Sequence, residues 1–174
     1  MNTIENIKAY EILDSRGVPT LLTEIVLDSG ITGHAAVPSG ASTGMHEALE
    51  LRDKDKKRYD GKGVLKNIDL INSSILDVLQ GLDVRDQKNI DSILLRLDGT
   101  KNKSKFGANT LLSVSLAAAK TSSILNNVEL YQYLGGINTD LLPIPLVNVI
   151  NGGAHAYNNL DIQEYMLAPL GAKT

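Results

Sequence analysis

The sequence predicts an α+β fold in which an antiparallel three-stranded meander is followed by a helical bundle. Three observations lead to this prediction. The first forty residues hold three short runs rich in aliphatic and β-branched residues, separated by tight turn clusters. Between residues 64 and 125 the apolar residues recur at three- and four-residue spacings, which is typical of amphipathic helices. After residue 142 two more short apolar runs follow, and they predict strands outside the first domain.

The three predicted strands of the meander cover Ile4–Leu13, Pro19–Leu27 and Ile31–Val37. Turn-forming residues separate them, at Asp14–Gly17 and at Asp28–Gly30. Connections this short join strands that run in opposite directions, so we expect a meander.

The second predicted strand alternates between two faces. Leu22, Glu24 and Val26 share one face, and this face is predicted to meet solvent because it holds a carboxylate. The opposite face, which is predicted to be buried, holds the alternate residues Leu21, Thr23, Ile25 and Leu27.

Four helical segments are predicted after the meander. Val64–Leu79 carries one apolar stripe and stops before Gly81, and Gln87–Leu97 shows the same spacing. Gly107–Leu125 is apolar on most sides, which predicts the buried central helix of the bundle. Glu129–Leu134 adds one short turn of helix.

The end of the chain changes back to strand character. Leu146–Ile150 and Ile162–Leu167 are the two predicted strands there. We therefore expect one α+β domain over residues 1–135, followed over residues 136–174 by a linker and two strands of a second domain.

Composition and charge exclude several classes of protein. The chain has no cysteine, so a disulfide framework and cysteine-bound metals are excluded. Its net charge of −3, a single Phe and the lack of Trp argue against nucleic-acid binding. The most apolar stretch, Leu111–Ala119, is too short to span a bilayer, and the first residues do not form a signal-peptide core. We expect a cytoplasmic protein without a membrane span.

Eight short segments of the sequence, taken together and in order, resemble one known family. They are Leu13–Thr20, Val37–Gly44, Glu50–Asp53, Gly61–Val64, Leu97–Thr100, Gly107–Asn109, Asn148–Ala156 and Gln163–Met166. This set is similar to the N-terminal domain of enolase (phosphopyruvate hydratase) followed by the first strands of its barrel domain. The resemblance covers essentially the whole chain.

The resemblance implies a fold, a reaction and a cofactor. Residues 1–135 would be the enolase N-terminal-like α+β domain, and residues 136–174 a linker with the first two strands of an incomplete α/β barrel. Enolases dehydrate 2-phosphoglycerate to phosphoenolpyruvate reversibly in glycolysis, with Mg²⁺, and act as homo-oligomers. A complete barrel takes about 250 residues. The family's three metal carboxylates, its Lys base, its principal acid and its phosphate-holding Arg match nothing in this chain, so the 174 residues alone are expected to be inactive.

The resemblance also implies roles for individual residues. The lid loop would be Ser39, Gly40, Ala41, Ser42 and Thr43, with Ser39 also ligating a second Mg²⁺. Composition alone gives Ser39 another interpretation, that of a simple turn residue in the Gly- and Ser-rich loop Pro38–Gly44.

The second group of implied site residues lies near the end of the chain. His155 and Glu164 would be catalytic, and both would contact substrate together with Gln163. A lone His after two glycines is often structural, and Glu164 has an edge-strand interpretation that is about as strong as the functional one. Gln163 and Glu164 are adjacent, so both reach one pocket only if the strand is irregular or ends there.

Three positions depart from the family pattern. The family usually has Arg where Tyr10 stands, Asn where Val18 stands, and a small or acidic residue where Tyr157 stands. In the family the first position lies near the contact between subunits, and Tyr157 follows closely on His155. These departures keep an alternative open, in which the chain is a truncated, non-catalytic relative that acts as a binding or oligomerisation module.

Overall fold

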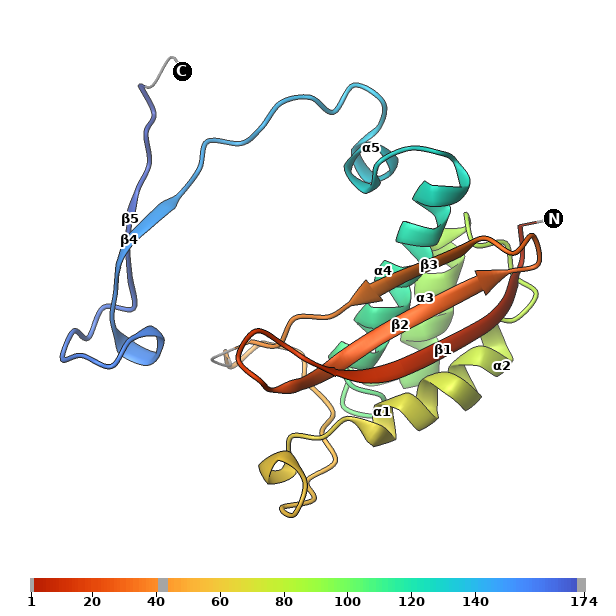
Figure 1. The fold of residues 1–174 in the computed structure, drawn as a ribbon, viewed down its shortest axis with the longest axis horizontal. Helices are drawn as coiled ribbons and strands as arrows, with labels where there is room; N and C mark the ends of the chain where they lie inside the picture. Colours follow the sequence, from red (N-terminus) through yellow and green to blue (C-terminus); the bar gives the residue numbers. More distant parts are fainter. Residues whose placement is uncertain (1, 41–43, 172–174) are drawn as a thin grey trace. The chain divides into compact units, whose positions relative to one another are not determined.

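The computed structural model describes residues 2–40 and 44–171, which fall into two compact units (Figure 1). The first unit ends at Asn138, and the second contains the chain from Thr139 onward. Within the described residues, no helix is both long and apolar enough to cross a bilayer.

The first unit is built on a three-stranded antiparallel sheet with the order β1-β2-β3. Its strands are β1 (Ile4–Leu13), β2 (Pro19–Leu27) and β3 (Thr32–Ala36), so the predicted meander is confirmed. β3 begins one residue later than predicted because the carbonyl of Ile31 closes the preceding turn, accepting a hydrogen bond of 2.9 Å from the N–H of Leu27.

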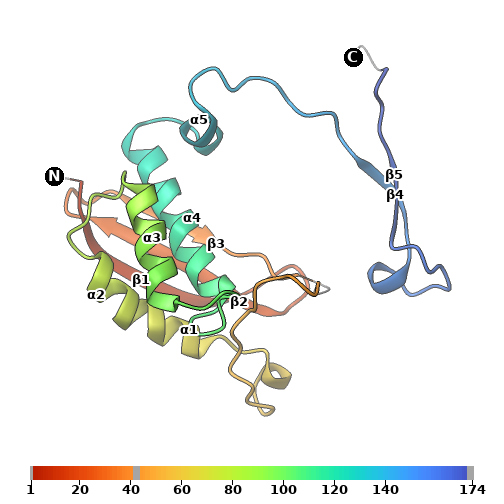
Figure 2. The ribbon, with the colours of Figure 1, turned by 180° about the vertical axis from the view of Figure 1, so that it is seen from behind.

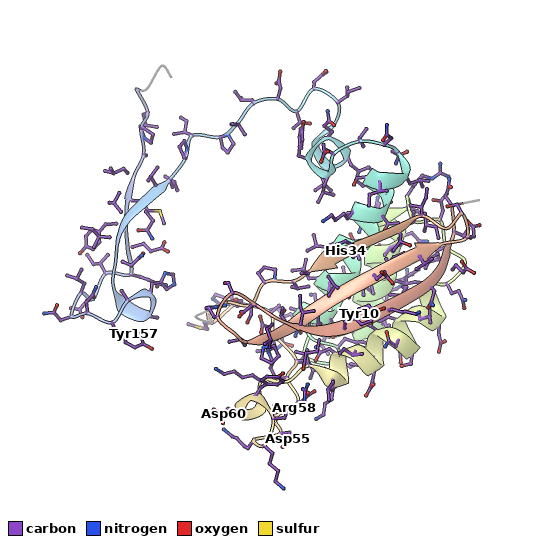
Figure 3. The ribbon with its side chains drawn as sticks, in the orientation of Figure 1. Tyr10, His34, Asp55, Arg58, Asp60 and Tyr157 are labelled. Carbon is purple, nitrogen blue, oxygen red and sulfur yellow. The ribbon has the colours of Figure 1, made fainter. Side chains whose placement is uncertain are left out.

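The two faces of β2 differ in burial as its alternation predicts. Leu22, Glu24 and Val26 are partly exposed, and the residues between them are buried. On the outer face Glu24 lies between Lys8 of β1 and His34 of β3. Tyr10 and His34 project from this face (Figure 3).

Helices cover the other face of the sheet (Figures 1 and 2). They are α1 (Leu65–Leu70), the π-helical turn η2 (Ile71–Ile75), α2 (Leu76–Leu79), α3 (Gln87–Asp98) and α4 (Ala108–Leu125), while the short helix α5 (Leu130–Gly135) packs against α4. α4 packs against β2 and β3, and α1 packs against β1. Most of α4 is buried, which confirms its predicted place at the centre of the bundle.

The helix predicted over Val64–Leu79 differs from the prediction at its middle, where the π-helical turn interrupts it. The extra residue in a π turn rotates the side chains that follow. Here Asn72 lies against the edge of β1, and its Oδ1 accepts a hydrogen bond of 2.9 Å from the N–H of Ala9. The turn therefore supplies a partner for an N–H on a strand edge that no neighbouring strand covers.

We expect Asn72→Ala to destabilise the first unit by about 1 kcal/mol, because the N–H of nearly buried Ala9 loses its partner. Ser73→Ala is the matched control, since the Ser73 hydroxyl bonds only within its own helix, to the carbonyl of Asp69. Urea denaturation of both variants measures the difference. Equal midpoints for the two variants would contradict the role given to Asn72.

A loop between β3 and α1 is tied to the sheet by an ion pair. The Arg58 guanidinium donates to both carboxylate oxygens of Glu11, one of them at 2.8 Å, and the N–H of Val64 donates to the same carboxylate at 3.0 Å. The hydrogen bond from Arg58 holds the pKa of Glu11 below its usual value. Asp53 caps the start of α1 by accepting from the N–H groups of Leu65 and Lys66, each at 2.9 Å.

A second carboxylate outside this loop has a larger shift. Hydrogen bonds from the Arg85 side chain and backbone lower the pKa of Asp83 to about 2. A group whose pKa is depressed in the folded state stabilises the fold above its unfolded pKa, near 3.9 for Asp, and this contribution is lost as pH falls. We expect the melting temperature to fall from about pH 5 downward, and the gap between the wild type and Asp83→Asn to narrow towards pH 2. Thermal unfolding of the wild type and Asp83→Asn over this pH range gives both melting temperatures. A difference between them that does not change with pH would contradict the lowered pKa of Asp83.

The second unit is a small antiparallel hairpin of β4 (Val147–Asn151) and β5 (Glu164–Leu167). The 3-10 turn η3 (Gly153–His155) lies in the connection between them. β5 begins two residues later than predicted, because the carbonyl of Gln163 is used to close the loop, accepting from the N–H of Gly152 at 2.9 Å.

Candidate functional site

Three of the predicted site residues meet in the second unit. Nδ1 of His155 lies 3.1 Å from Oε1 of Glu164, and Nε2 of His155 lies 2.6 Å from Nε2 of Gln163. The side chains of His155 and Glu164 are 30% and 33% exposed, so solvent reaches the group.

The two adjacent residues Gln163 and Glu164 both reach His155 because β5 starts at Glu164. Gln163 lies just before the strand, where the side chains of consecutive residues need not point to opposite faces. Both side chains can therefore reach the same group, as the sequence allows where the strand is irregular or ends.

The glycine turn before His155 packs closely against the loop that precedes β5, and this packing places His155 beside Glu164. A Cβ on Gly152 would lie 2.4 Å from the carbonyl oxygen of Ile162 and 2.7 Å from Leu160, so no side chain fits there. The next N–H, that of Gly153, donates to the carbonyl of Leu160 at 2.8 Å. The loop that precedes β5 thus folds against the turn that carries His155.

The contacts define a consistent protonation pattern for the His155 ring. If Nδ1 carries the proton and donates a hydrogen bond to Glu164, then Nε2 has a lone pair that accepts a hydrogen bond from the Gln163 amide. A protonated ring would need Gln163 to turn its amide oxygen towards Nε2 or to yield that place to an anion. The carboxylate at Nδ1 holds the orientation of the ring.

Tyr157 does not cover this group. Its side chain is fully exposed and projects from the loop (Figure 3).

The other predicted site residue, Ser39, lies in the first unit. Its hydroxyl donates to Oε2 of Glu50 at 3.2 Å and accepts from Nη2 of Arg52 at 3.0 Å. Its carbonyl accepts from Nη2 of Arg16 at 2.6 Å. Gly40 follows as an exposed residue, and Ala41, Ser42 and Thr43 of the predicted lid loop lie outside the described residues.

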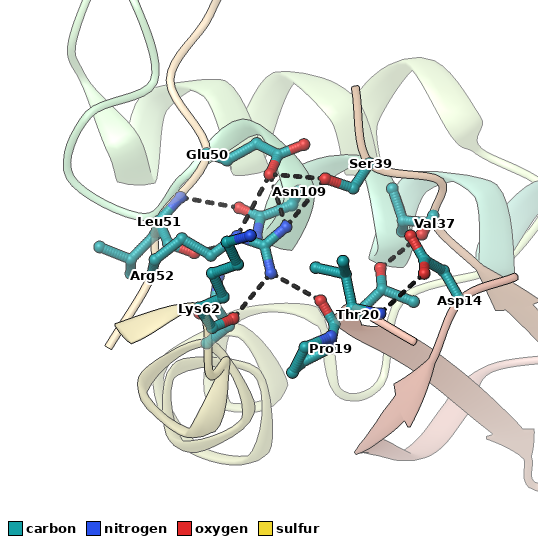
Figure 4. Close-up of polar contacts among 12 residues, drawn as sticks. Asp14, Pro19, Thr20, Val37, Ser39, Glu50, Leu51, Arg52, Lys62 and Asn109 are labelled. Carbon is teal, nitrogen blue, oxygen red and sulfur yellow. Dashed lines mark hydrogen bonds and ion pairs between the residues drawn. The ribbon is translucent and has the colours of Figure 1, made fainter. Parts of the chain in front are cut away.

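Arg52 is the centre of this network (Figure 4). Besides Ser39 and Glu50, its guanidinium donates to the carbonyls of Pro19 at 2.6 Å and Lys62 at 2.8 Å. It thereby joins the start of β2, the segment that follows β3 and the loop before α1. The predictions from sequence did not give Arg52 or Glu50 a role, although both belong to a segment that carries the family resemblance.

Comparison with known families now adds an independent finding. The family model of the enolase N-terminal domain matches residues 4–134, well over half of the chain. The chain belongs to the enolase family. The model of the enolase C-terminal TIM barrel domain matches residues 139–174, so the start of the barrel domain is present as the sequence predicts.

The family resemblance implies that Mg²⁺ binds to enolases. Mg²⁺ prefers several hard oxygen ligands in an octahedral arrangement. Within residues 2–40 and 44–171 no group of three or more His, Cys, Asp or Glu side chains is placed to hold a metal. Both oxygens of Ser39 face guanidinium groups. This arrangement of the enolase chain does not fit Mg²⁺.

A second layer of contacts supports the Ser39 network in this enolase domain. The side-chain amide of Asn109 bonds both the N–H and the carbonyl of Leu51, each at 3.0 Å, and so fixes the segment between Glu50 and Arg52 on the start of α4 (Figure 4). The N–H of Ala108 donates to the carbonyl of Leu49 at 2.7 Å. Ser39 is therefore positioned by residues far away in the sequence.

Proposed function

We propose that this chain serves the enolase reaction, the reversible dehydration of 2-phosphoglycerate to phosphoenolpyruvate, as one wall of the substrate pocket. The contact between His155 and Glu164, with Gln163 at the opposite ring nitrogen, carries the proposal. These three residues are the proposed substrate contacts, with His155 and Glu164 in the catalytic roles.

The chemistry of the group suits an anionic substrate. A ring held at Nδ1 by Glu164 can offer Nε2 to the ligand when Gln163 yields its place there, and protonation of the ring makes it a donor to a phosphate or carboxylate oxygen. Gln163 supplies an amide beside the same nitrogen, which can donate to or accept from a second oxygen. Glu164 also offers a carboxylate that can accept from a hydroxyl or a water molecule.

The complete reaction needs more than these residues. Removing a proton next to a carboxylate creates a doubly negative intermediate, which requires clustered cations for its stabilisation. Within the described residues, no group of three or more His, Cys, Asp or Glu side chains is placed to hold the metal ions that would supply this positive charge. We therefore propose that the 174-residue chain does not turn over substrate by itself, and that the family's Mg²⁺ needs ligands from other residues.

The remaining parts of the proposal follow from the family. Residues 1–135 form its N-terminal domain and residues 136–174 the linker and first barrel strands. The protein acts in the cytoplasm, in glycolysis, as a homo-oligomer.

A direct experiment tests the pocket. Phosphoenolpyruvate is titrated into the purified chain while the imidazole signals of His155 and His34 are followed by NMR. We expect the His155 signals to move and those of His34, on the outer face of the sheet, to stay, with the response lost in Glu164→Gln. An equal response of both rings, or none at His155, would refute the proposed pocket. Robust turnover of 2-phosphoglycerate with Mg²⁺ would refute the proposed inactivity.

One observation favours the second candidate function, a binding or oligomerisation module. The hairpin exposes apolar side chains on both strands: Val147, Val149, Ile150, Met166 and Leu167. A two-stranded hairpin is marginal alone, and such surfaces are typical of interfaces.

Light scattering after size-exclusion chromatography tests this candidate. An assembly held by the hairpin should dissociate in Leu167→Lys and persist in Leu65→Lys, a control at an exposed position of α1. A monomeric wild type would exclude the oligomerisation role.

A further inference from the structure

The family resemblance makes Ser39 a metal ligand, so a cation would have to reach its oxygens. Nη2 of Arg16 donates to the carbonyl oxygen at 2.6 Å, and Nη2 of Arg52 donates to the hydroxyl oxygen at 3.0 Å. Each oxygen that a cation would need thus faces a positive charge. The carboxylate of Glu50, which accepts from the Ser39 hydroxyl, is itself neutralised by Arg52 at 2.7 Å.

The two arginines hold Ser39 with different strength. A guanidinium has five N–H donors, and Arg52 uses them on Ser39, Glu50, Pro19 and Lys62, with Glu50 accepting from both Nε and Nη2. Arg52 cannot leave Ser39 without disturbing its contacts to three other residues. Its side chain is only 17% exposed.

Arg16 is held less firmly. Its side chain is 47% exposed, and its contact with Asp14 is long, at 3.4 Å. The carbonyl oxygen of Ser39 is therefore the easier of the two to release, because Arg16 can turn into solvent.

We propose that Arg52 is the positioning residue of Ser39, and that Arg52 and Arg16 together keep divalent cations away from both Ser39 oxygens. A cation reaches Ser39 only after these guanidinium groups move, Arg16 first. The inference rests on the proposed function only in taking Ser39 as the residue that the family resemblance assigns to metal. It does not depend on the substrate contacts of His155.

Mn²⁺ provides the test, since it is paramagnetic and broadens the amide signals of residues near it. The purified chain is titrated with MnCl₂ as wild type, Arg16→Gln and Arg52→Gln. Removing one unit charge near the oxygens should lower the Mn²⁺ concentration that half-broadens the Ser39 amide by about fivefold. Arg85→Gln is the matched control, because it removes the same charge from an exposed pair with Asp83, and it should leave Ser39 at the wild-type value.

Arg52→Lys separates position from charge. Lysine keeps the charge but has three donors, so it cannot serve all four partners of Arg52. We expect the chemical shift of the Ser39 amide to change in Arg52→Lys, whereas Mn²⁺ broadening stays closer to the wild-type value than in Arg52→Gln.

The outcomes decide the matter. If Arg16→Gln and Arg52→Gln respond to Mn²⁺ as Arg85→Gln does, the guanidinium groups do not exclude cations. If Arg52→Lys leaves the chemical shift of the Ser39 amide unchanged, Arg52 does not position Ser39. Should Arg52→Gln fail to fold, as its circular dichroism would show, Arg16→Gln alone decides the first question. No substrate is present, so failure here is distinct from failure of the proposed pocket.

Discussion

Gly107→Ala is expected to destabilise the first unit by about 4 kcal/mol, the largest effect of any single substitution proposed for this chain. Gly107 has φ +89°, a conformation that costs a residue with a side chain about 1–3 kcal/mol. A Cβ there would also lie 2.5 Å from Cβ of Leu51 and 2.7 Å from its backbone nitrogen. Relieving that overlap costs about 1–3 kcal/mol more, because Leu51 is held by Asn109.

Gly81→Ala is the control that separates the two costs. Gly81 has a similar φ of +82°, but nothing lies within 4 Å of a Cβ at that position. Urea denaturation should therefore show a loss of only about 1–2 kcal/mol for Gly81→Ala. Equal losses for the two variants would show that Leu51 does not press on Gly107.

The role of Gly107 illustrates what the sequence could and could not predict. Strand and helix positions follow from local periodicity, so β1 and β2 have the predicted bounds and the buried face of β2 is the predicted one. The close approach of Gly107 to Leu51 joins segments 56 residues apart and leaves no periodic pattern. The π turn escaped prediction for the same reason, since its stabilising contact is with β1.

The candidate site divides in the same way. The meeting of Gln163 and Glu164 at His155 follows from neighbours in one hairpin, and the sequence named all three residues. The surroundings of Ser39 depend on Arg52 and Arg16, which come from two other segments. A motif shows which residues belong together in a family, but the contacts between motifs need the fold.

Four of the segments that carry the family resemblance in fact form one support. The carboxylate of Asp98 in Leu97–Thr100 holds the loop that leads to Gly107–Asn109. Asn109 fixes Leu51 within Glu50–Asp53, and Arg52 fixes Ser39 within Val37–Gly44. A substitution in Leu97–Thr100 should therefore alter how Ser39 is held in Val37–Gly44.

Asp98→Ala tests the start of this support and should cost about 3 kcal/mol. Asp98 is 2% exposed and accepts hydrogen bonds from the N–H groups of Thr100 at 2.9 Å and Phe106 at 2.8 Å. Burial raises the pKa of Asp98, but hydrogen bonds from Thr100, Phe106 and Lys105 together lower it by more than burial raises it. The net shift is therefore downward, and the carboxylate stays charged. Without it the buried N–H of Phe106 has lost its acceptor, at a cost of about 1–3 kcal/mol for each such group.

Two further variants make this prediction specific. Asp98→Asn keeps one acceptor oxygen but turns an NH₂ group towards the other donors, so it should lose about half as much stability as Asp98→Ala. Asp77→Ala, at an exposed position of α2, should change stability by less than about 0.5 kcal/mol. Urea denaturation at neutral pH gives the three values, and amide exchange reports on Phe106 and Leu51. If Asp98→Ala frees the amide of Phe106 but leaves that of Leu51 protected, the loop is held by Asp98 while the segment that carries Arg52 is held independently by Asn109.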